Sequence, residues 1–129
     1  MSKSLSMKKE LNILVIDDNE QITKMISTFL KFNNHKCTIA NDGKYGQELL
    51  QKDDFDVIIL DLAMPDIDGY EILEQTESQK ILSKIIILTA SNITKENSKK
   101  FKKIGVETVL LKPVDMDTLL EKIDLISNR

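Results

Sequence analysis

Several side chains that could take part in chemistry stand directly after short apolar runs of this chain. In chain order they are Asp17 and Asp18, Asp61, Thr89, and Lys112. Carboxylates brought close together repel one another, and one of them must protonate unless a cation neutralises the group. Carboxylate oxygens and a loop carbonyl suit Mg²⁺, which keeps several waters and bridges readily to phosphate oxygens. A carboxylate can also act as a nucleophile and form an aspartyl phosphate, whose oxygens an ammonium and a hydroxyl could stabilise.

The apolar runs predict the strands that would position these side chains. The run 57–60 is Val-Ile-Ile-Leu, Asp61 follows it, and Met64-Pro65-Asp66 and Asp68-Gly69 then break the chain into a loop. A short β-branched run of this kind is typical of a strand that is buried on both faces of a parallel sheet. Comparable runs predict strands at 11–16, 36–40, 85–88 and 106–111, and the run 85–88 ends on Thr89-Ala90-Ser91.

Between the predicted strands, apolar residues recur at helical spacing and predict helices. Asn19 suits an N-cap, and the apolar residues that follow it at helical spacing are Ile22, Met25, Ile26, Phe29 and Leu30. Two further helices are marked by Tyr45, Leu49 and Leu50 and by Tyr70, Ile72 and Leu73. The segment 94–104 offers only Phe101 and Ile104 to a core, and Gly105 suits its C-cap. Asp115 should cap a last helix, whose expected buried residues are Met116, Leu119, Leu120, Ile123 and Ile126.

The order of these elements predicts an α/β fold in which a parallel sheet is covered by helices on both faces. The carboxyl ends of parallel strands lie at the same edge, where open α/β sheets bind ligands. Taken singly, each chemical residue has a commoner structural explanation, such as a helix cap, a strand residue or a solvated strand end. Their coincidence at four strand ends favours a phosphate site.

Length and composition limit the other possibilities. The chain has 129 residues and a formal net charge of −3, which fits one domain and gives no domain-wide nucleic-acid footprint. No apolar run approaches the length that crosses a membrane, and residues 1–10 lack the apolar segment of a signal peptide. The single cysteine, Cys37, suits a reducing compartment. We therefore expect a cytoplasmic protein with a flexible segment at 1–10 and one domain at 11–127, with no second domain after the final helix.

Three other features have plain structural explanations. His35 stands beside Asn33 and Asn34, so a solvated turn residue is the expected interpretation, and Cys37 should be a small core residue. The segment 94–104 carries Lys95, Lys99, Lys100, Lys102 and Lys103. Such a run is most often a solvated face, and docking against an acidic protein is the alternative.

At this point the sequence resembles a known family, the receiver domain of two-component response regulators, with the stand-alone chemotaxis regulators as the nearest kind. The resemblance rests on Asp17-Asp18, the segment from Asp61 to Gly69, Leu88-Thr89-Ala90 and Lys112-Pro113, and it covers roughly residues 11–126. It implies a flavodoxin-like sheet of five parallel strands in the order 2-1-3-4-5. It also implies a cis peptide bond between Lys112 and Pro113.

The resemblance further implies a function. Asp61 would accept a phosphoryl group from the phosphohistidine of a histidine kinase or phosphotransfer protein, and the domain would pass the signal on by protein contact, through the surface 94–126. Asp18, Asp61 and the Ala63 carbonyl would bind Mg²⁺ directly, and Asp17 mainly through water. Lys112 would bond the phosphoryl group and Thr89 would move to reach it. The domain would assist its own phosphotransfer and dephosphorylation and would have no other enzymatic activity.

One departure from the family concerns the readout of phosphorylation. Receivers usually carry Tyr or Phe three residues before the lysine, where this chain has Val109, and Val114 stands at a nearby position that is often Phe. The usual inward-turning aromatic ring is therefore missing at that position.

Three alternatives use parts of the same pattern. A haloacid-dehalogenase-like phosphatase needs a second Asp two residues after the nucleophile, where this chain has Ala63, and no cap domain is present. A flavin or dinucleotide carrier would share the sheet, but the chain has no Gly-x-Gly-x-x-Gly or Walker motif. A degenerate receiver that acts without phosphorylation is the third, although every site residue is intact.

Overall fold

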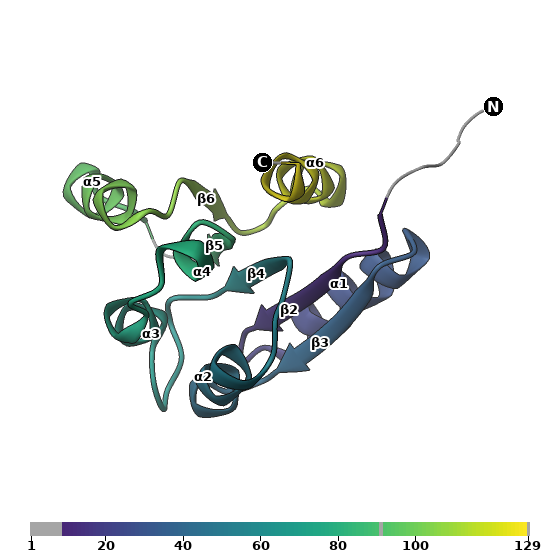
Figure 1. The fold of residues 1–129 in the computed structure, drawn as a ribbon, viewed down its shortest axis with the longest axis horizontal. Coiled ribbons are helices and arrows are strands. Elements are labelled where there is room, and N and C mark those ends of the chain that lie inside the picture. Colours follow the sequence, from purple (N-terminus) through teal and green to yellow (C-terminus); the bar gives the residue numbers. More distant parts are fainter. Residues whose placement is uncertain (1–8, 91, 129) are drawn as a thin grey trace.

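The computed structural model of the chain describes residues 9–90 and 92–128 (Figure 1). The expectation of a flexible segment at residues 1–10 therefore falls almost wholly outside the described residues, and so does Ser91. Lys9 and Glu10, the described part of that segment, are exposed.

Five parallel strands form a single sheet. They are β2 (Asn12–Ile16), β3 (Lys36–Ala40), β4 (Val57–Leu60), β5 (Ile85–Thr89) and β6 (Thr108–Leu111). The spatial order is β3-β2-β4-β5-β6, which is the order 2-1-3-4-5 when strands are counted along the chain. The predicted fold class is therefore confirmed.

Helices connect the strands, and each begins with a side chain that accepts a hydrogen bond from a backbone N–H of its first turn. The helices are α1 (Glu20–Phe32), α2 (Gly43–Lys52), α3 (Gly69–Gln75), α4 (Gln79–Leu82), α5 (Lys95–Ile104) and α6 (Met116–Ser127). The caps expected at Asn19 and Asp115 are present. The single turn α4, capped by Ser78, was not predicted.

Alternate residues of each central strand face opposite sides of the sheet. Ile13 and Val15 of β2 pack with α1 and α6, whereas Leu14 and Ile16 pack on the other side with α2, α3, α4 and α5. The two helical layers are visible on either side of the sheet in Figure 1. The continuous apolar runs of the sequence follow from this, because both faces of the central strands are buried.

Some predicted core residues lie at the surface. Met25 is 51% exposed and Tyr45 is 47% exposed, whereas Thr23 and Ser27 of α1 are buried. The buried face of α1 is thus rotated toward small polar residues, and the Thr23 hydroxyl there accepts a hydrogen bond from Asn41 Nδ2 at 3.0 Å. Tyr70 is also partly exposed, although it stacks on Phe101 with ring centroids 5.9 Å apart.

Two local predictions around turns were wrong. His35 is buried, because the chain reverses at Asn34 (φ 67°) and brings the imidazole Nδ1 to within 3.1 Å of the Leu11 N–H, which donates to it. Strand β6 begins at Thr108 and not at Val106, because the Val106 N–H donates to Phe101 O and completes the end of α5. Gly105 there has the left-handed φ of 112° expected of a C-cap, and the Lys112–Pro113 peptide is cis as expected.

Candidate functional site

The acidic residues of the site come from two adjacent strands. Ile16 and Leu60 are register partners in β2 and β4, so Asp17 and Asp61, which follow them, leave the sheet side by side. The Asp61 N–H donates to Ile16 O at 2.9 Å, and the Asp17 N–H donates to Ala40 O at 3.0 Å. The sheet thus continues through the backbone of both aspartates and fixes where their side chains begin.

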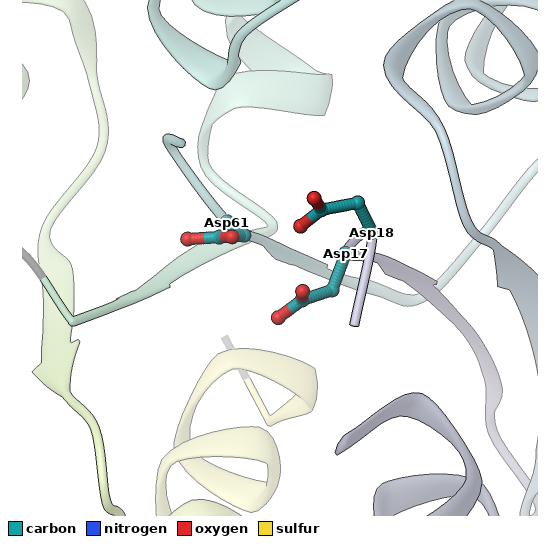
Figure 2. A group of neighbouring side chains, drawn as sticks. All are labelled: Asp17, Asp18 and Asp61. Atoms are coloured by element: carbon teal, nitrogen blue, oxygen red, sulfur yellow. The ribbon is translucent and has the colours of Figure 1, made fainter. Parts of the chain in front are cut away.

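Asp17, Asp18 and Asp61 form a compact cluster, shown in Figure 2, in which one carboxylate oxygen from each lies within 4.8 Å of the others. Asp17 and Asp61 are buried, whereas Asp18 is exposed. The three aspartates that the sequence predicts in one site are therefore close together in the structure. A group of oxygen donors with one face open to solvent fits a hard divalent cation such as Mg²⁺.

Lys112 provides the positive charge within this cluster. Its Nζ lies 2.7 Å from Asp17 Oδ2 and 3.6 Å from Asp61 Oδ2. The side chain of Lys112 is only 15% exposed, so both interactions are shielded from bulk water. An anion attached to Asp61 Oδ2 would therefore lie close to this ammonium.

Burial and neighbouring charges act on the acidity of Asp61. Desolvation raises the pKa of its carboxyl group, the charges of Asp17 and Asp18 add to the rise, and Lys112 and the Ala63 N–H oppose it. The Ala63 N–H lies 3.5 Å from Asp61 Oδ1. Because the ionised form is the nucleophile, a bound cation would favour the reactive state of Asp61.

Thr89 completes the set at the same edge of the sheet. It ends β5, the strand next to β4, and it is fully buried. The Lys112 N–H donates to Thr89 O at 2.9 Å, so the backbone that carries the ammonium is tied to the backbone that carries the hydroxyl.

Two residues that support the site were missed at the sequence level. Asn41 Nδ2 donates to Asp17 O at 3.0 Å and links the end of β2 to the turn after β3. Asp66, in the loop after Asp61, accepts hydrogen bonds from the first backbone amides of α2. The sequence marks Asn41 as part of an Asn-Asp-Gly turn. It does not indicate that Asn41 would bond to Asp17, or that Asp66 would bond to the start of α2.

Val109, the departure in the family pattern, is half-buried and packs against the core cluster that contains Phe101. The aromatic contact in this part of the structure is instead the stack of Tyr70 and Phe101, which joins α3 to α5.

Comparison with known proteins agrees with this geometry. Residues 13–124 match the response regulator receiver domain family. The chain is 34% identical over 118 residues to the response regulator ArlR of Staphylococcus epidermidis. The matched segment covers 92% of this chain and 53% of ArlR. It is 27% identical over 127 residues to the sensor histidine kinase RcsC of Escherichia coli K12, covering 98% of this chain and 13% of RcsC. The chain thus spans about half the length of ArlR and a smaller part of RcsC.

Solved structures give the same result. The receiver domain of a Francisella response regulator superimposes with a TM-score of 0.83 at 32% identity, covering 93% of this chain and 98% of that one. The chemotaxis protein CheY4 of Vibrio cholerae superimposes with a TM-score of 0.80 at 29% identity, covering 92% of this chain and 99% of that one. Among the described residues, no helix has the length and apolar character needed to span a bilayer. With the family match over most of its length and an acidic cluster at the expected edge of the sheet, the chain belongs to the response regulator receiver domain family, the phosphorylation-dependent switches of two-component systems.

Proposed function

We propose that Asp61 is the phosphoacceptor of this receiver domain, which we assign to residues 11–127. A carboxylate oxygen of Asp61 attacks the phosphorus of a phosphohistidine on a histidine kinase or phosphotransfer protein. The new bond is O–P, the bond that breaks is N–P, and the nitrogen keeps the electron pair. The observation that supports this most directly is the cluster of Asp17, Asp18 and Asp61 with Lys112 Nζ between Asp17 and Asp61.

The residues present also fit Mg²⁺. Their donors are carboxylate oxygens, and they include the exposed Asp18. The pKa of Asp61 is raised mainly by burial, and the negative charges of Asp17 and Asp18, which a cation would neutralise, add to the rise. Asp18, Asp61 and the Ala63 carbonyl would bind the ion directly, and Asp17 through water. When bound, the ion neutralises charge on the phosphoryl oxygens.

The remaining residues act on the phosphoryl group itself. Lys112 would pair with one of its oxygens from its present position, 3.6 Å from Asp61 Oδ2. The buried hydroxyl of Thr89 would donate to another oxygen after a local shift of the end of β5. The same groups would stabilise the hydrolytic transition state, so the domain would assist its own dephosphorylation.

We propose that the phosphorylated domain signals by protein contact through the surface 94–126, in the cytoplasm. The basic face of α5 supports this position for the contact, since its lysines are exposed and carry charge opposite to that of the chain as a whole. The partner is a protein, and neither nucleic acid nor a membrane is expected to bind.

The test is phosphorylation by a small acyl phosphate with Mg²⁺, followed by measurement of the intact mass. We expect the protein to gain the mass of a single phosphoryl group, and we expect Asp61→Asn to gain none. Phosphorylation that survived this change, or that survived chelation of the metal, would overturn the site. Steady turnover of a phosphomonoester would instead indicate a phosphatase.

A further inference from the structure

The loop after Asp61 is tied to a helix that lies far from it in the sequence. Asp66 Oδ1 accepts a hydrogen bond from the Gly43 N–H at 3.0 Å, and Asp66 Oδ2 accepts one from the Lys44 N–H at 3.0 Å. Both amides belong to the first turn of α2, whose N–H groups have no partner within the helix. A carboxylate also interacts favourably with the positive end of the helix dipole.

Backbone packing reinforces this attachment. Gly43 is buried directly beneath Ile67, and a Cβ atom at residue 43 would collide with the Ile67 carbonyl oxygen. The residue after Asp66 therefore rests on the start of α2, and the two segments cannot move independently without breaking both contacts. The same backbone amides hold the pKa of Asp66 below its usual range.

A second attachment closes the loop at its base. The Gly69 N–H donates to Leu62 O at 2.9 Å, and a Cβ atom at residue 69 would lie 2.7 Å from Leu62 Cα. The loop is thus held at Gly69, beside Asp61, and at Asp66, on α2. Ala63 lies between Leu62, the partner of Gly69, and Asp66, and it is itself exposed.

We propose that Asp66 is a positioning residue for the Mg²⁺ site. It holds the loop against α2, restricts where the Ala63 carbonyl can lie relative to the carboxylate cluster, and thereby sets the affinity for the ion. This inference rests on the proposed function, because it concerns the same site. Without Asp66 the loop would have to be ordered when the ion binds, and ordering even a single residue's backbone lowers affinity about tenfold.

The experiment is a calorimetric Mg²⁺ titration of the full chain, its Asp66→Ala and Asp66→Asn variants, and an Asp42→Ala control. Asp42 is exposed, carries the same charge, and caps the same helix through the Tyr45 N–H at 2.7 Å. Among the described residues, the hydrogen bond of its side chain is to α2 and not to the loop. We expect Asp66→Ala to bind Mg²⁺ about tenfold more weakly. Asp66→Asn keeps a single acceptor oxygen and should lie between Asp66→Ala and the parent.

The rates of phosphorylation by an acyl phosphate separate positioning from a general loss of structure. Asp66→Ala should need more Mg²⁺ to reach half its maximal rate, but its rate at saturating Mg²⁺ should return to that of the parent. Asp42→Ala should melt at a lower temperature and keep the parent's Mg²⁺ affinity. If Asp66→Ala does not fold, the Asp66→Asn titration decides.

Equal Mg²⁺ affinity in Asp66→Ala and the parent, or an equal loss in Asp42→Ala, would overturn the role of Asp66 and leave the proposed function standing. A parent protein that neither bound Mg²⁺ nor became phosphorylated would overturn both.

Discussion

Charge balance among a few side chains governs the site at the scale of single residues. Asp17 has two fixed partners, the Asn19 N–H at 2.9 Å from Oδ1 and Lys112 Nζ at 2.7 Å from Oδ2. Asp61 has the weaker contact with Lys112, at 3.6 Å, and its pKa is raised mainly by burial. Exposed Asp18 is the member whose charge can be removed without leaving a buried group unpaired.

Asp18→Asn should therefore stabilise the protein in the absence of a divalent metal while weakening Mg²⁺ binding. The reason is that the charge of Asp18 repels the ionised Asp61 carboxylate and also attracts the cation. A rise in melting temperature of about 2 °C is expected in chelator, since only a fraction of a kcal/mol of repulsion is removed. Thermal melts in chelator and a Mg²⁺ titration measure the two effects. A variant that melted below the parent in chelator would contradict the prediction.

Cys37 gives a prediction about pH outside the site. Burial raises the pKa of its thiol, although a hydrogen bond from Ser27 and the charge of Lys31 partly oppose this. Because the thiol has a higher pKa in the folded state, it contributes stability at pH values below its unfolded-state pKa. That contribution is lost as the pH rises through the folded-state pKa. The difference in melting temperature between the parent and Cys37→Ala should thus shrink between pH 8 and pH 10, and native alkylation should be slow at pH 8. Rapid alkylation of the native protein at that pH would refute this.

At the scale of elements, α5 differs from the other helices in how it is held. Phe101 is its buried residue and Ile104 is half-buried, while its lysines face solvent. Phe101 stacks on Tyr70, which directly follows Gly69 at the end of the loop after Asp61. This aromatic pair connects the loop to α5, and it does not involve position 109.

Hydrogen exchange should show that α5 responds to phosphorylation. With few core contacts it belongs to the less stable part of the fold, so a phosphoryl mimic with Mg²⁺ should change protection mainly between residues 92 and 105. Val109→Ala should leave this response largely intact, because a β-branched side chain with a single χ angle cannot act as a swinging ring. Identical exchange in both states, or loss of the response in Val109→Ala, would place the readout elsewhere.

At the scale of the whole molecule, Mg²⁺ should act as a ligand of the folded state alone, because the carboxylates meet only after β2 and β4 have paired. At a hundredfold excess over its dissociation constant, such a ligand stabilises by about 2.7 kcal/mol. The melting temperature should then rise by roughly 10 °C for a domain of this size. Asp61→Asn should reduce the rise, and NaCl of matched ionic strength should not reproduce it. Equal shifts with both salts would mean that screening alone is responsible.

The sequence by itself determined the features that depend on residues close together along the chain, namely the strands and the helix caps. The five strands were predicted because their apolar residues pack on both faces of the sheet. The caps at Asn19, Asp115 and Gly105 were predicted because a helix end needs a local partner for its free backbone groups. The edge of the sheet at which Asp17, Asp18 and Asp61 meet followed from the parallel order of the strands.

Only the tertiary structure decided what depends on partners far along the chain. Met25 is exposed and His35 is buried, although their sequence surroundings indicate the opposite, because rotation of α1 and the reversal at Asn34 fix which side chains meet the sheet. The parallel order of the strands predicts Lys112 at the same edge as Asp17, but only the structure shows that the two side chains pair, across 95 positions, and that Asp66 reaches Gly43 across 23. Such contacts have no local signal, since the distance between two side chains is set by how the strands and helices pack and not by the residues that flank either one.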